Sequence, residues 1–213
     1  MFKHALLNHS NNMKLKIIFA SALLASFLFS CNSTKSTEAT AVDSTGTEAT
    51  FMVDPTASNI VWEGNMVKLY KHYGDLKISE GSFTVKGLQV TGGSFTADMK
   101  SISPTDSNYS AEHPKEYLVG HLSDTSFFSV GTYPTATFVI KTVSGNTATG
   151  DLTLRGITNE ETVTNILVDT VGAVKATGKL VVDRQKYKVA YKADGDKVLS
   201  NDITLDITLV GKK

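Results

Sequence analysis

The stretch Asp202–Leu209, DITLDITL, decides the fold class of this 213-residue chain. Polar and apolar residues alternate in it without a break, and its apolar members are Ile203, Leu205, Ile207 and Leu209. Because successive side chains of a β-strand point to opposite faces, the alternation predicts a strand with one dry face and one wet face. Strands of this kind are typical of antiparallel sheets.

Shorter runs with the same alternation recur upstream, and glycine-containing turns separate them. Strands are expected over residues 60–66, 76–85, 89–99, 135–143, 147–154, 161–169 and 174–183. Turns are expected at Lys86-Gly87, Ser144-Gly145-Asn146, Arg155-Gly156 and Val171-Gly172-Ala173. The total of about eight strands is near the number at which a closed barrel can enclose one small ligand. The pattern therefore predicts an all-β antiparallel fold, either a barrel or a two-sheet sandwich.

One short helix is expected to begin near Pro114, because proline suits the first turn of a helix. Four residues would fall along one face of it: Tyr117, Leu118, His121 and Leu122. Residues 68–75, which carry His72, read as a loop or a strand end. Gly92-Gly93 predicts a bulge or bend in the strand over 89–99.

The segment His121–Phe138, HLSDTSFFSVGTYPTATF, connects this helix to the next strand. It presents the pair Phe127-Phe128 and then breaks at Gly131-Thr132-Tyr133-Pro134, where glycine and proline favour a turn. The residue before a proline is pushed toward extended geometry, so a strand can follow directly. We expect the two phenylalanine rings to anchor the helix and the loop against the barrel.

The start of the chain has the pattern of a secretory signal. From Met13 it reads MKLKIIFASALLASFLFSC, in which two lysines precede an apolar core over 17–29 and the small Ser30 stands before Cys31. The apolar core is shorter than the roughly 20 residues that a membrane-spanning helix needs, so a cleaved signal fits better than a retained transmembrane helix. We expect a signal peptide over residues 1–30, with Met13 as the true start of translation.

Cys31 is the only cysteine of the chain, which excludes an internal disulfide, a thiol catalyst and a cysteine metal site. The box Leu28-Phe29-Ser30-Cys31 resembles the processing site of bacterial lipoproteins, which implies that Cys31 is lipidated; the alternative is a free cysteine behind the signal. Residues 31–50 are rich in Ser and Thr and are expected to form a flexible tether. One folded domain is then left, over residues 51–213.

Charge and motifs restrict the function. The 21 Lys plus Arg balance the 21 Asp plus Glu, whereas a nucleic-acid-binding surface would show a basic excess. The chain has no Gly-x-Ser-x-Gly elbow, phosphate loop or His-Glu-x-x-His motif, and its histidines lack metal-ligand spacing. Asp106, Glu112 and His113 could form an acid-base cluster, but a solvated loop is the simpler interpretation. No catalytic residue, metal or cofactor is expected.

Three segments together resemble the YceI-like family of exported, lipocalin-like barrels that bind polyisoprenoid lipids. They are His121–Phe138, GDLTLRGIT over 150–158 and DRQKYKVAY over 183–191. The resemblance covers most of residues 51–213 and implies an up-and-down barrel of about eight strands. Its cavity would hold an amphiphilic isoprenoid lipid, either a polyprenyl phosphate or an isoprenoid quinone.

This resemblance implies a membrane-tethered binding protein and not an enzyme. The alternative is a ligand-free module of the cell envelope whose surface binds a partner protein. No acid-rich run follows Cys31, which favours a lipid anchor in the outer membrane facing the periplasm. A homodimer is left open.

Apolar ligand contacts are expected from Trp62, Phe127 and Phe128, each of which could instead be plain core packing. A phosphate or quinone head group needs a cation or a hydrogen-bond donor near a barrel mouth. Arg184 and His121 are the main candidates for that role.

Each head-group candidate has a structural alternative. Arg184 could simply pair with Asp183 or a neighbouring carboxylate, and His121 could be a hydrogen-bonded packing histidine. His72 and Arg155 are weaker candidates for the same role.

Overall fold

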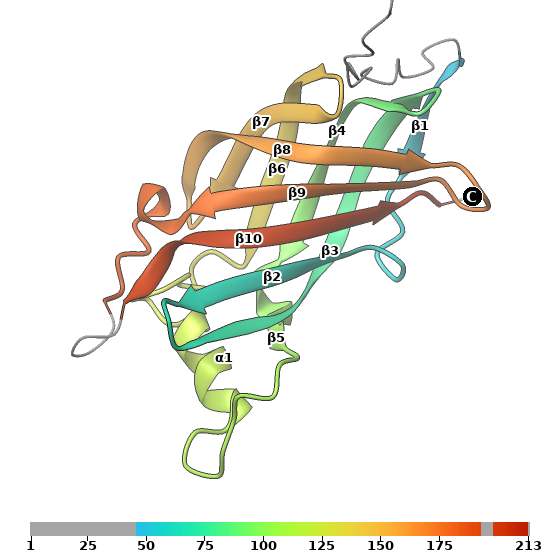
Figure 1. Ribbon diagram of the computed structural model, residues 1–213. Coiled ribbons are helices and arrows are strands. Elements are labelled where there is room, and N and C mark those ends of the chain that lie inside the picture. The colour runs from blue at the N-terminus through green and yellow to red at the C-terminus, as the bar shows by residue number, and fades with distance from the viewer. Residues whose placement is uncertain (1–45, 193–197, 213) are drawn as a thin grey trace, which may run out of the picture. The chain divides into compact units, whose positions relative to one another are not determined.

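Eight antiparallel strands close into one barrel in the computed structural model of the chain, which describes residues 46–192 and 198–212 (Figure 1). Each barrel strand pairs with the next one along the chain, and β10 pairs with β2 to close the ring. The expected up-and-down barrel is therefore confirmed, and the sandwich is excluded. The strands are β2 (Asn59–Met66), β3 (Tyr70–Lys86), β4 (Gln89–Asp98), β6 (Thr135–Ser144), β7 (Thr147–Leu154), β8 (Ile157–Asp169), β9 (Lys175–Asp183) and β10 (Leu199–Val210).

Two short strands add to the sheet outside this ring. Both β1 (Glu48–Met52) and β5 (Ser103–Pro104) pair with β3. β1 includes Glu48–Thr50, which the sequence had assigned to the tether. The expected signal peptide, Met13, Cys31 and the tether up to residue 45 lie outside the described residues. Among the residues described, no helix is long and apolar enough to cross a membrane.

The long strand β3 joins the two ends of the barrel. Its first half pairs with β2, and its second half pairs with β1 and β4. It already begins at Tyr70, so of the loop and the strand end expected over 68–75 the strand end is confirmed, and His72 lies in β3. Lys71, Tyr73 and Asp75 face outward, but the residues between them are His72 and Gly74 and not aliphatic ones, so no apolar alternation was visible in the sequence. The bulge expected near Gly92 is confirmed, because the pairing with β3 shifts there.

The turn between β7 and β8 also has its expected form. Leu154 pairs with Ile157, so only Arg155 and Gly156 form the loop. Both have positive φ, 51° and 70°, which is the backbone of a two-residue hairpin turn that matches the twist of its strands.

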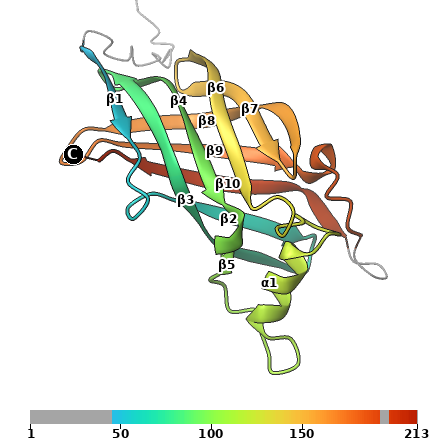
Figure 2. The same cartoon turned by 180° about the vertical axis from the view of Figure 1, so that it is seen from behind.

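One helix, α1 (Lys115–Ser123), lies beside β5 at the end of the barrel where β2 ends and β10 begins (Figures 1 and 2). We call this end the mouth, and the end at the β3–β4 turn the closed end. Leu122 is buried, but Tyr117 is 66% exposed, so the expectation that both share the packed face is wrong. Tyr117 stands roughly 100° around the helix from Leu118, which turns it toward solvent. Two 3₁₀ turns complete the fold: η1 (Met99–Ser101) and η2 (Arg184–Tyr187).

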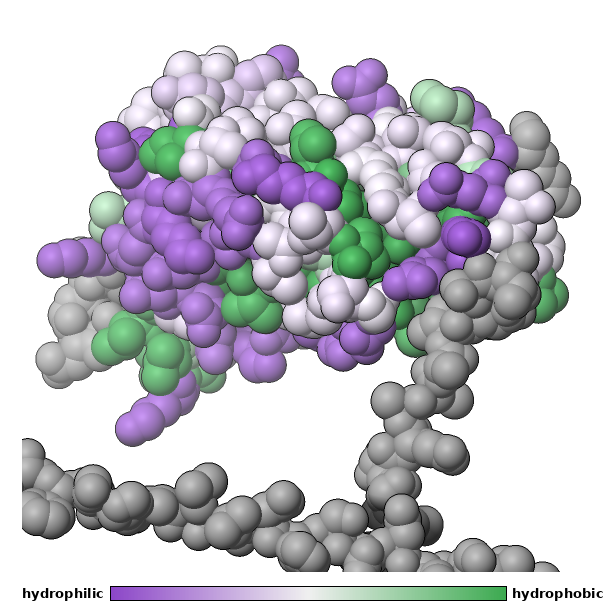
Figure 3. Space-filling view, turned by 90° about the horizontal axis from the view of Figure 1, so that it is seen from above, coloured by the Kyte–Doolittle hydropathy of each residue, from purple (hydrophilic) through white to green (hydrophobic). Residues whose placement is uncertain are grey.

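The outside of the barrel is mostly hydrophilic or neutral in the view of Figure 3, with apolar groups in a few small clusters. The apolar faces of the strands instead point inward and form one core. Alternation along each strand therefore accounts for a wet outer wall and a dry interior.

Candidate functional site

A cavity of about 260 Å³ lies inside the barrel at the mouth. Pockets that bind drug-sized molecules have volumes of about 300–1,000 Å³, and one water needs only about 10–15 Å³. The wall consists almost entirely of apolar side chains, among them Leu76, Phe95, Met99, Phe138, Leu152 and Leu180. None of the described residues that line the wall is an aspartate or a glutamate. The interior therefore suits an apolar chain.

Strand β2 shows how the sequence forms this wall. Every second residue lines the cavity, namely Ile60, Trp62, Gly64 and Met66. A Cβ atom placed on Gly64 would meet nothing within 4 Å. The missing side chain of Gly64 thus leaves open space between Trp62 and Met66, level with its strand partner His72.

All five residues predicted to bind ligand line this cavity: Trp62, His121, Phe127, Phe128 and Arg184. Their contact with a ligand stays a prediction. Trp62 lines the cavity with its indole ring, whose Nε1 is buried and has no hydrogen-bond partner among the residues described. Phe127 is buried and Phe128 partly buried, as expected of anchors for α1 and its loop.

His121 belongs to an aromatic cluster at the mouth. Its ring centroid lies 5.3 Å from that of Phe127 and 4.4 Å from that of Tyr191, both in edge-to-face geometry. Burial lowers the pKa of His121, and the carboxylate of Asp124 opposes this shift. Within the described part of the chain its side chain has no hydrogen bond, so His121 packs without the hydrogen bond that sequence reasoning had proposed.

Arg184 is only 3% exposed and holds the backbone at the mouth. Its Nε donates to the carbonyl oxygen of Ser200 at 3.0 Å, and its two Nη atoms donate to those of Val189 and Leu199. The alternative of a side-chain pair with Asp183 or a neighbouring carboxylate is wrong among the described residues, because the Arg184 nitrogens donate to backbone carbonyls instead. Burial lowers the pKa of the Arg184 guanidinium, and Asp183 opposes the shift.

Arg155 does not line the cavity, so the weaker suggestion that it binds a head group is wrong. Its guanidinium donates to the carbonyl oxygens of Lys188 at 3.0 Å and Thr125 at 2.7 Å. It therefore ties the β7–β8 turn to η2 and to the loop after α1.

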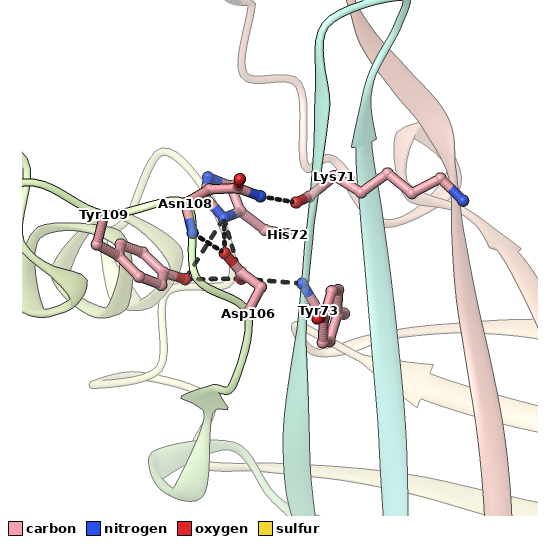
Figure 4. Close-up of polar contacts among 6 residues, drawn as sticks. All are labelled: Lys71, His72, Tyr73, Asp106, Asn108 and Tyr109. Carbon is pink, nitrogen blue, oxygen red and sulfur yellow. Dashed lines mark hydrogen bonds and ion pairs between the residues drawn. The ribbon is translucent and has the colours of Figure 1, made fainter.

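His72 lines the cavity from β3 and forms the polar cluster shown in Figure 4. Its Nδ1 lies 3.2 and 3.1 Å from the two carboxylate oxygens of Asp106. Tyr109 Oη donates to the same carboxylate at 2.8 Å. The expectation of a solvated loop is wrong here, because Asp106 is only 7% exposed.

The carboxylate of Asp106 also accepts the backbone N–H groups of Asn108 and Tyr73. Burial alone would raise the pKa of Asp106, but hydrogen bonds from Asn108, Tyr109, His72 and Tyr73 lower it below its usual value. Sequence reasoning missed this pair because His72 and Asp106 are 34 positions apart. No short motif links them.

Glu112 and His113, the other members of the suggested acid-base cluster, form hydrogen bonds with Ser110 instead. The Ser110 hydroxyl donates to the Glu112 carboxylate and accepts from the backbone N–H of His113.

Fold and cavity together define an up-and-down β-barrel with an apolar interior and a polar group at its mouth. The chain belongs to the YceI-like family, since the model of the YceI-like domain matches residues 51–211. The resemblance found in the sequence is thereby confirmed.

Two solved structures share the fold. The crystal structure of Burkholderia cenocepacia BcnA has a TM-score of 0.52 and 21% identity, and the alignment covers 75% of this chain and 99% of that one. A polyisoprenoid binding domain from Saccharophagus degradans, implicated in plant cell wall breakdown, has a TM-score of 0.50 and 14% identity over 76% of this chain and 98% of that one.

A UPF0312 protein of Staphylococcus aureus strain USA300 is 31% identical over 96 aligned positions, and the alignment covers 40% of this chain and 56% of the relative. The chain thus spans about half the length of the curated relatives that it matches.

Proposed function

We propose that this protein binds an amphiphilic isoprenoid lipid, a polyprenyl phosphate or an isoprenoid quinone, in the cavity at the barrel mouth. The observation that carries the proposal is about 260 Å³ of space inside a wall whose described residues are mostly apolar and include no carboxylate. Each buried CH₂ group of a ligand chain would contribute about 0.8 kcal/mol before the cost of association is subtracted. The polyisoprenoid binding domain of S. degradans, which has the same fold, supports the choice of ligand.

A binding role also agrees better with the cavity than the alternative of a ligand-free envelope module. A barrel that only displays its outer surface would have its interior filled by side chains, as interiors normally are. We therefore infer a ligand-binding protein, and the fold shared with a polyisoprenoid binding domain supports binding over catalysis.

In this proposal the lipid anchor on Cys31 holds the domain at the membrane from which the isoprenoid is taken. The signal-like pattern over residues 1–30 and the polar residues 31–50 support this arrangement. The outer membrane, facing the periplasm, is the proposed location. Metabolic labelling with a palmitate analogue, compared between wild type and Cys31→Ser, tests the anchor: label should appear only on the wild type.

Native mass spectrometry of freshly purified protein tests the binding. We expect a mass increment of one isoprenoid lipid, or saturable uptake of polyprenyl phosphate or isoprenoid quinone by protein stripped with organic solvent. Trp62 is the only tryptophan and lines the cavity, so its fluorescence offers a second readout of uptake. Protein that carries no lipid and takes none up would refute the proposal.

A further inference from the structure

We propose that His72, oriented by Asp106 and Tyr109, is the group that binds the head-group oxygen of the ligand. This inference rests on the proposed function and adds to it the place and chemistry of the polar contact. The ligand class is an isoprenoid with an oxygen on its head group, whether carbonyl or phosphoryl. The main candidates named from the sequence were Arg184 and His121.

The position of His72 connects the cavity with solvent. Its side chain is 22% exposed and also lines the cavity. Next to it, Tyr70 lines the cavity and is 41% exposed. Opposite on β2 stands Gly64, which leaves open space at the same level. A ligand whose chain fills the interior would thus place its polar end beside the His72 ring.

Only one ring nitrogen of His72 is available to a ligand. Nδ1 contacts the Asp106 carboxylate. An ionised carboxylate can only accept hydrogen bonds, so the Nδ1 atom that faces it must carry a proton. Nε2 has no hydrogen-bond partner among the residues that the structure describes. With the proton on Nδ1, Nε2 of the neutral ring is an acceptor. It donates to a carbonyl or phosphoryl oxygen when the ring carries a second proton, as an imidazolium whose charge the Asp106 carboxylate balances, and this is the form that binds an oxygen head group.

The ring is also held in one orientation. Tyr109 stacks on it with centroids 5.5 Å apart, and Tyr70 meets it edge-on at 5.1 Å. Asn108 Nδ2 donates to the Lys71 carbonyl oxygen at 2.8 Å and fastens the Asp106 loop to β3 (Figure 4). Such fixation reduces the rotamer entropy that binding would otherwise cost.

The other basic groups of the wall fit this role less well. Arg184 already donates from all three of its nitrogens to backbone carbonyls. His121 packs against aromatic rings. His72 therefore combines access, orientation and a nitrogen left for the ligand.

The test compares ligands with and without an oxygen head group. Geranylgeranyl phosphate, menaquinone-4 and the hydrocarbon squalene are titrated into stripped wild type, His72→Phe and the control His113→Phe, an exposed histidine outside the cavity. His72→Phe should weaken binding of one or both oxygenated ligands about five- to tenfold, the worth of about one hydrogen bond, and leave squalene unchanged. Loss for the phosphate alone would mark a phosphoryl site, and loss for the quinone alone a carbonyl site.

Equal affinities of His72→Phe and wild type for both oxygenated ligands would overturn this inference but leave the proposed function standing. Equal weakening of all three ligands would overturn it too, because a head-group contact cannot affect squalene. No uptake of any ligand by wild type would refute the proposed function itself.

Asp106 is a positioning residue in this scheme, and ¹⁵N NMR of the His72 ring tests it independently of affinity. An oxygenated ligand should shift the Nε2 signal of wild-type protein and leave Nδ1 bound to Asp106. Asp106→Asn should redistribute the proton between the two nitrogens. An Nε2 signal that does not respond to either oxygenated ligand would contradict the site.

Discussion

The two ends of the barrel are made of the same strands, but their interiors are filled differently. Near the closed end the remaining void is about 40 Å³, and Phe83 is 1% exposed. At the mouth the cavity is about 260 Å³ and carries His72 and Arg184 in its wall. Alternating apolar residues occur at both ends, so alternation explains the barrel and not the cavity. The cavity forms where β5, α1 and the loop after α1 cover the strand ends.

The largest effect is expected from removing a ring at the closed end. Phe83→Ala should lower the free energy of unfolding by about 3–5 kcal/mol, because the densely packed neighbours cannot move to fill the space that the ring leaves. The same change at the mouth, Phe128→Ala, should cost only about 1–2 kcal/mol, since that ring is partly buried beside an existing cavity. Urea unfolding measures both values. Equal costs would contradict the difference between the ends.

Arg184 should be next in effect, because it holds the mouth together from a buried position. Arg184→Met leaves the carbonyl oxygens of Val189 and Ser200 without their donor, which should cost about 2–3 kcal/mol. Arg155→Met is the matched control, since Arg155 donates to two backbone carbonyls from a partly exposed position, and should cost about 1 kcal/mol. If Arg155→Met lowered the free energy of unfolding as much as Arg184→Met, the burial of Arg184 would not explain the cost of replacing it.

The mouth should also respond to pH through His121. Its pKa is lowered by burial, so below about pH 6.5 the unfolded chain binds a proton that the folded chain does not. The stability gained by keeping His121 neutral is therefore fully present above that pH, and it is lost as the pH falls through the lowered pKa. His121→Phe should reduce this decrease below about pH 6.5, whereas the exposed His113→Phe should not. Unchanged slopes of unfolding free energy against pH in His121→Phe would contradict the assignment.

The smallest effect is expected at Trp62. Its Nε1 has no partner among the described residues, so Trp62→Phe loses no hydrogen bond and should cost about 1 kcal/mol or less. Ligand uptake, followed by native mass spectrometry, should persist because an aromatic ring still lines the cavity at this position. A large loss of uptake would mean that the N–H group contacts the ligand.

Much of the fold could be predicted from the sequence because local patterns determine it. The alternation over β10 and the Arg155-Gly156 turn each depend on neighbouring residues only. β1 escaped prediction because EATFM continues a Ser- and Thr-rich stretch and gains its partners from β3, far along the chain.

The site was predictable only in its apolar part. Inward-facing rings such as Trp62 and Phe127 follow from strand periodicity and from the segment before β6. The pairing of His72 with Asp106 depends on how β3 and the loop after β5 meet, and no spacing in the sequence encodes that. The same holds for Arg184, whose partners are backbone carbonyls that any residue could supply.

Filling the mouth cavity tests the central claim most directly. Gly64→Phe places a ring in the open space of the cavity, whereas Gly92→Phe adds the same ring on β4 outside it, where a Cβ also meets nothing within 4 Å. Native mass spectrometry of both folded variants with menaquinone-4 or geranylgeranyl phosphate should show uptake in Gly92→Phe and at least about tenfold weaker uptake in Gly64→Phe. Undiminished uptake by folded Gly64→Phe would show that the ligand binds elsewhere.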